Sequence, residues 1–151
     1  MLAANTVPTE QTARRCLTPK LGSGVDPNHI IYREGKSELG CAKQIANSLS
    51  KNFAALTSAN LDTAPDIISR LSDQVVTGAR SAFVLVDEGN FGMNNGIKRV
   101  IRDLASSLAT LGENLAAAKT TPNLRPLELK LAQDSVSAAQ KAIDAVGRFH
   151  D

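Results

Sequence analysis

The chain has 151 residues, of which 42% are hydrophobic, and it contains no Trp, one Tyr and four Phe. This length fits one domain with a buried core, while the shortage of aromatic residues disfavours a small-molecule pocket or a catalytic cleft, whose dry walls usually need them. Seventeen basic and fifteen acidic residues leave a net charge of +2, which disfavours a nucleic-acid-binding domain with a clustered basic stripe.

Residues 1–36 are expected to form an extended or disordered N-terminal arm. They are rich in Pro, Gly and Thr and show no sustained hydrophobic period. A short apolar island begins at His29 within this arm. We predict that its Ile30 and Tyr32 contact either the rest of the domain or a partner protein.

The first helix is predicted over about residues 38–58, and the second over about 64–88. Apolar positions in the first step alternately by three and four residues, which is a heptad seam; they are Leu39, Ala42, Ala46, Leu49, Phe53 and Leu56. The second helix has Thr63 as a cap and Pro65 in its first turn. Its apolar face is wider than a single seam because it also carries Phe83 and Leu85, which we predict as a protein interface.

The third and fourth helices are predicted over about residues 95–119 and 125–147. The third has the most regular seam in the chain, formed by Ile97, Ile101, Leu104, Leu108, Leu111, Leu115 and Ala118. Four helices of this length with short connections predict an all-α protein. We expect an antiparallel up-down four-helix bundle over residues 37–151, preceded by the N-terminal arm.

The residue types that metal binding and catalysis require are scarce. The only histidines are His29 and His150, and no HExxH, CxxC or EF-hand spacing occurs. Cys16 and Cys41 do not make a disulfide framework, and Cys41 is expected to act as a small apolar residue on a helix. We therefore predict no metal, no cofactor and no catalytic residue, and we expect a protein that is not an enzyme.

Two features predict where the protein acts. No run approaches the roughly 18 apolar residues that span a bilayer, so the chain is not expected to be transmembrane. The N-terminus lacks the apolar segment of a cleavable signal peptide, and the sparse cysteines favour a reducing compartment. We expect an intracellular location, or export without a cleavable signal peptide and a peripheral position on a membrane.

One local preference is broken at the start of the third helix. Lys98, Arg99 and Arg102 occupy its first turns, where the helix dipole disfavours cations, and Lys98 and Arg102 are a like-charge pair four residues apart. In an antiparallel bundle the same end gathers further cations. The predicted anion- or lipid-binding residues are Lys98, Arg99, Arg102, Arg80, Lys36 and Arg148.

These features favour a non-catalytic interaction or localisation module that docks through a basic bundle end. Its predicted partner is an anionic membrane surface or an acidic protein, not nucleic acid, and a homodimer is left open. In outline, a long bundle with a basic end is similar to the four-helix membrane-localisation domains of bacterial toxins and secreted effectors. That resemblance implies phosphoinositide binding, a role in virulence, and an N-terminal targeting domain within a larger effector.

Two alternatives stay open. Gly78-Ala79-Arg80-Ser81 and Asn90-Phe91-Gly92-Met93 resemble the Arg-Ser and Gln-Trp-Gly-Thr motifs of bacterial effector Rho-GTPase-activating domains, although the Trp is missing. This resemblance implies a GTPase-activating domain with Arg80 as an arginine finger. The second alternative is a structural subunit that assembles with copies of itself.

Overall fold

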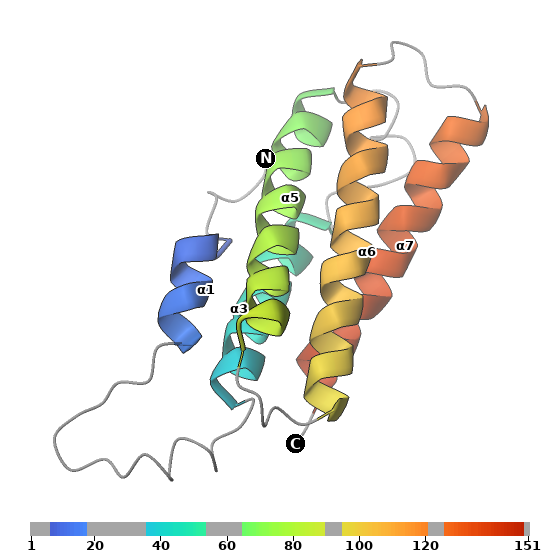
Figure 1. The fold of residues 1–151 in the computed structure, drawn as a ribbon. Coiled ribbons are helices and arrows are strands. Elements are labelled where there is room, and N and C mark those ends of the chain that lie inside the picture. The colour runs from blue at the N-terminus through green and yellow to red at the C-terminus, as the bar shows by residue number, and fades with distance from the viewer. Residues whose placement is uncertain (1–6, 18–35, 54–64, 90–94, 121–125, 150–151) are drawn as a thin grey trace, which may run out of the picture.

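The structure is a computed structural model, and it describes residues 7–17, 36–53, 65–89, 95–120 and 126–149. Helix is the only regular secondary structure in these ranges, which confirms the prediction of an all-α protein. The described helices are α1 (Glu10–Leu17), α3 (Lys36–Phe53), α5 (Pro65–Asp87), α6 (Asn95–Thr120) and α7 (Pro126–Arg148) (Figure 1). None of them is both long and apolar enough to cross a bilayer.

The four long helices bury the predicted seams against one another. Helix α3 packs on α5 and α7, and α6 packs on α5 and α7, while consecutive helices run in alternating directions (Figure 1). Burial removes the seam side chains from water, which is the main stabilising term in such a fold. The largest fully buried side chains are Ile45, Leu49, Leu71, Val75, Leu85, Ile97, Ile101, Leu104, Leu108, Leu111, Leu115 and Val146.

Glycine at position 78 allows α5 to approach its neighbours closely. A Cβ atom there would lie 3.1 Å from Cδ1 of Leu49 on α3 and 3.4 Å from Cδ1 of Leu108 on α6. Gly112 on α6 likewise allows close approach to α5. A Cβ atom added at Gly112 would lie 3.2 Å from Cγ2 of Val76. Small residues at these crossings let the helices interdigitate without forcing side chains off their preferred rotamers.

The expectation of an extended or disordered arm is wrong for residues 10–17, which form α1. Thr9 caps a short helix there, because the Thr12 amide donates to the Thr9 hydroxyl oxygen at 3.3 Å and Glu10 lies in the first turn. Helix α1 packs across α3 and α5, with Val7 and Ala13 buried. The heptad pattern of apolar residues in the four long helices does not extend into this segment. That pattern therefore does not predict α1.

The two cysteines form a disulfide bond, which their small number in the sequence did not predict. Cys16 on α1 and Cys41 on α3 form a disulfide with their Cα atoms 6.6 Å apart. Cys41 is buried, as expected, but it serves as a covalent anchor rather than as a small apolar residue. The cross-link ties the N-terminal segment to the long helices.

Candidate functional site

The three cations that break local preference lie exposed on the first two turns of α6. Lys98, Arg99 and Arg102 point away from the buried seam, and the first turn of α6 holds no acidic residue. Within the described ranges none of the three forms an ion pair, including Arg99 with the exposed Asp103 four residues later. No described side chain therefore offsets the unfavourable dipole and the like-charge repulsion through a direct ion pair.

An exposed aromatic side chain lies on α5, the helix that packs against α6. The close approach of Val76 to Gly112 sets the antiparallel register of α5 and α6. Counted two turns along each helix from this contact, Phe83 is expected at about the level of Ala105 on α6. Phe83 is 36% exposed and is one of two large hydrophobic side chains exposed in the described part of the chain.

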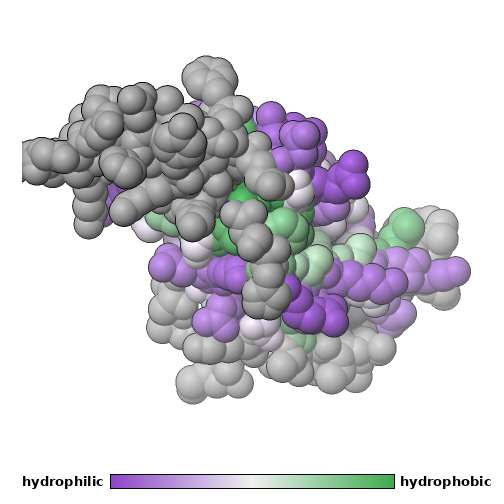
Figure 2. Space-filling view, turned by 90° about the horizontal axis from the view of Figure 1, so that it is seen from below, coloured by the Kyte–Doolittle hydropathy of each residue, from purple (hydrophilic) through white to green (hydrophobic). Residues whose placement is uncertain are grey.

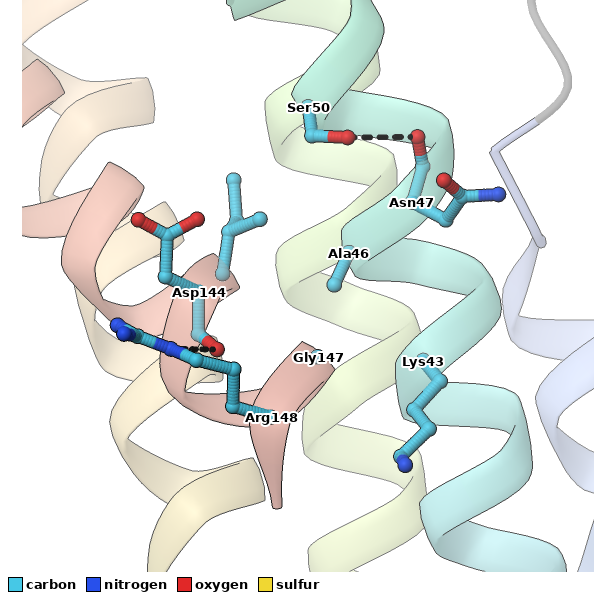
Figure 3. A pocket seen from close by; sticks show the side chains of 8 residues that line it. Lys43, Ala46, Asn47, Ser50, Asp144, Gly147 and Arg148 are labelled. Carbon is cyan, nitrogen blue, oxygen red and sulfur yellow. Dashed lines mark hydrogen bonds between the residues drawn. The ribbon is translucent and has the colours of Figure 1, made fainter.

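The opposite side of the same end carries a groove between α3 and α7 (Figure 3). It has a volume of about 430 Å³, with Lys43 and Asn47 on the α3 wall and Asp144 and Arg148 on the α7 wall. The Nε atom of Arg148 donates to the backbone carbonyl oxygen of Asp144 at 3.4 Å. Two cations and one carboxylate leave the groove with a net charge of +1.

Seen from the end that holds the starts of α3 and α6, the described residues are mostly hydrophilic, with a smaller apolar area near the middle of the view (Figure 2). Alternation of helix direction places Arg148, at the end of α7, at the same end as the start of α6 (Figure 1). Four of the predicted cations, Lys98, Arg99, Arg102 and Arg148, therefore share one end. We call these four residues the basic end.

Arg80 does not belong to the basic end. It lies two turns before the end of α5 and lines a separate pocket of about 350 Å³ beside the N-terminal segment, together with Thr9, Glu10, Gln11 and Thr77. Lys36 begins α3, but its side chain is outside the described residues. Residues 90–93, which carry the second half of the GTPase-activating resemblance, are also outside them.

The residues predicted as a protein interface have different outcomes. Leu85 is fully buried within the chain, so it belongs to the core and offers no surface to a partner. Phe83, two positions earlier, is exposed because two residues rotate a helix by roughly 200°. Ile30 and Tyr32 lie outside the described residues.

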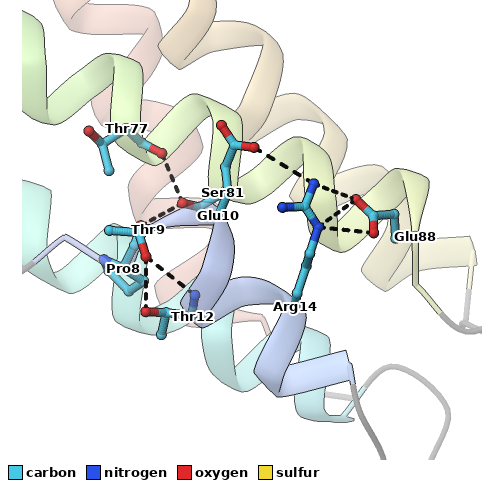
Figure 4. Close-up of polar contacts among 8 residues, drawn as sticks. All are labelled: Pro8, Thr9, Glu10, Thr12, Arg14, Thr77, Ser81 and Glu88. Carbon is cyan, nitrogen blue, oxygen red and sulfur yellow. Dashed lines mark hydrogen bonds and ion pairs between the residues drawn. The ribbon is translucent and has the colours of Figure 1, made fainter.

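The contact between the N-terminal segment and α5 was not predicted (Figure 4). The buried Ser81 hydroxyl donates to the backbone carbonyl oxygen of Pro8, and Nη2 of Arg14 lies 3.1 Å from Oε2 of Glu88. Hydrogen bonding to Glu88, with its negative charge, raises the pKa of Arg14. The sequence does contain a signal for α1. Thr9 followed by Glu10 is typical of a helix start, and Ala13 and Leu17 are apolar residues four positions apart.

The described residues contain no group of three or more His, Cys, Asp or Glu side chains that could hold a metal ion. Comparison with protein-family models gives no match, and comparisons with curated proteins and with solved structures give none either.

Proposed function

We propose that the protein is a non-catalytic binding module in which α3, α5, α6 and α7 form a rigid four-helix bundle whose basic end docks on the anionic headgroups of a membrane. The observation that carries the proposal is the set of three exposed cations, Lys98, Arg99 and Arg102, in the first two turns of a helix, none of which forms an ion pair with a described side chain. An anionic surface would relieve their mutual repulsion and their unfavourable position in the helix dipole.

The contribution of the three cations to membrane affinity can be bounded. A Lys or Arg side chain close to an anionic leaflet contributes roughly 1 kcal/mol, so three contribute about 3 kcal/mol, or on the order of a hundredfold in affinity. The exposed ring of Phe83 on α5, the helix that packs against α6, adds apolar contact with the interface. Lys43 and Arg148 along the α3–α7 groove offer a second place for an anionic headgroup.

Co-sedimentation with vesicles tests this proposal. We expect binding to vesicles that contain phosphatidylserine or a phosphoinositide, weaker binding as salt screens the charges, and none to neutral phosphatidylcholine. Replacement of Lys98, Arg99 and Arg102 by Ala should weaken binding about a hundredfold.

The matched control replaces three other exposed cations, Arg70, Lys130 and Lys141, by Ala, and so removes the same charge. Circular dichroism would verify that both triple variants stay helical. If both triple variants lose vesicle binding equally, binding depends on net charge and not on the basic end. If the variant of Lys98, Arg99 and Arg102 loses no binding, the proposal is overturned. If the intact chain binds polyglutamate but not the vesicles, the partner is an acidic protein surface.

A further inference from the structure

The Cys16–Cys41 disulfide joins two helices that are held in very different ways. Helix α3 is one of the four long helices, which supply all of the largest fully buried side chains among the described residues. Helix α1 lies against α3 and α5 (Figure 1). To the buried hydrophobic core, residues 7–17 contribute Val7 and Ala13, with Cys16 and Leu17 partly buried. Most of the core therefore lies within the four long helices.

The noncovalent contacts of α1 with these helices are weak. It has 8 residues, fewer than the roughly 12–15 that an isolated helix needs in water, so its order depends on docking. About half of each side chain of the Arg14–Glu88 pair is exposed (52% and 48%), and an ion pair in that position contributes little. The disulfide, which bridges a sequence separation of 25 residues, is therefore the strongest link between α1 and the long helices.

Helix α5 tolerates the loss of its contact with the N-terminal segment. The buried Ser81 hydroxyl bonds the backbone carbonyl oxygen of Pro8, but the carbonyl oxygen of Thr77, one turn earlier on α5, also lies 2.9 Å from it (Figure 4). When Pro8 departs, the second acceptor stays in place and the hydroxyl keeps a partner. Release of α1 therefore does not carry the cost of an unpaired buried hydroxyl.

The disulfide is open to reduction from the side of Cys16. This residue lies in the last turn of α1 and is partly exposed, whereas Cys41 is only 4% exposed. A dithiol reductant, as its thiolate, attacks Sγ of Cys16, and Sγ of Cys41 leaves and takes up a proton. The second thiol of the reductant then displaces Sγ of Cys16, which also takes up a proton. Two electrons pass to the protein, which gains two thiols, while the dithiol becomes a disulfide.

We propose that the Cys16–Cys41 disulfide is a redox-sensitive lock on α1. Its reduction releases α1 from α3 and α5, while the four long helices stay folded. The chain-entropy relation for a loop of this length gives a shift on the order of a hundredfold toward the released state. Elements with few buried contacts open locally without unfolding of the rest of the molecule. Reoxidation closes the same bond and returns α1 to α3 and α5.

Hydrogen exchange measured by mass spectrometry tests the lock. The intact chain is compared before and after reduction with dithiothreitol, which is a dithiol. We expect the amides of α1 to lose protection on the order of a hundredfold, while those in the middle of α6 keep theirs. Oxidised glutathione should restore the protection of α1; it takes two electrons and two protons from the two thiols and leaves as two molecules of glutathione.

The matched control is Cys16→Ser, which cannot form the bond. Its α1 should exchange fast with or without dithiothreitol, and its α6 should stay as protected as in the intact chain. The proposal is wrong if α1 keeps its protection after reduction. It is also wrong if α6 loses protection together with α1, because the chain then unfolds as a whole. Neither cysteine belongs to the basic end, so vesicle binding and hydrogen exchange test separate proposals.

Discussion

At the scale of single residues, the exposure of a side chain follows its angular position on the helix more closely than its hydrophobicity. Phe83 and Leu85 stand two positions apart on α5, yet one is 36% exposed and the other fully buried. The same holds for the glycines in the helices. Gly78 faces Leu49, Ile45 and Leu108, while a Cβ on Gly40 would meet nothing within 4 Å.

The glycines give a residue-scale prediction. Replacement of Gly78 by Val should lower stability by about 1–3 kcal/mol, because added methyl groups would overpack the crossing of α5 with α3 and α6. At roughly 2–4 °C per kcal/mol for a domain of this size, thermal unfolding should detect the change. Gly40→Ala is the control, and it should raise stability by up to about 1 kcal/mol through helix propensity. An unchanged melting temperature for Gly78→Val would show that α5 can move outward without cost.

At the scale of elements, α1 differs from the long helices in what holds it. The long helices are stabilised by continuous apolar seams, whereas α1 buries little surface and relies on the disulfide, the Ser81–Pro8 hydrogen bond and the Arg14–Glu88 pair. A cross-link acts mainly by restricting the unfolded chain. An exposed ion pair has no comparable effect, because solvent screens it in the folded state.

Removal of the cross-link should therefore matter more than removal of the ion pair. For a loop of this length the chain-entropy relation gives a loss of about 3.5 kcal/mol for the Cys16→Ser, Cys41→Ser double variant. Glu88→Gln should cost much less. Urea unfolding of the three proteins checks the order, and an equal or larger loss for Glu88→Gln would contradict it.

At the scale of the whole molecule, the alternating direction of the helices determines which charged residues lie at the same end. Lys98, Arg99, Arg102 and Arg148 share one end because α6 starts there and α7 finishes there (Figure 1). The large hydrophobic side chains exposed in the described part of the chain, Phe83 and Leu131, lie on different helices. They do not form the contiguous apolar patch that stable self-association generally needs.

The oxidised protein is therefore expected to be a monomer. Light scattering should give a mass of 16.0 kDa that does not change with concentration. A mass that grows with concentration under oxidising conditions would favour the alternative of a self-assembling structural subunit.

The seams and the positions of the long helices could be predicted from the sequence because they depend on local periodicity. The predicted helices at about 64–88, 95–119 and 125–147 agree closely with α5, α6 and α7, and every seam residue of α6 whose side chain is described is buried. The exposed cations of α6 were recognisable for the same reason: the helix start and the charges lie within a few residues of each other.

Other features were decided only by tertiary structure, because they join residues that are distant in sequence. The disulfide needs α1 placed against α3, and the Arg14–Glu88 ion pair needs α1 laid over α5. The α3–α7 groove brings Lys43 and Arg148 together only when the first and last long helices pack side by side. Local periodicity predicts which face of each helix is buried, but helix–helix packing determines which faces contact each other. Helix α1 is too short to be ordered before that packing exists.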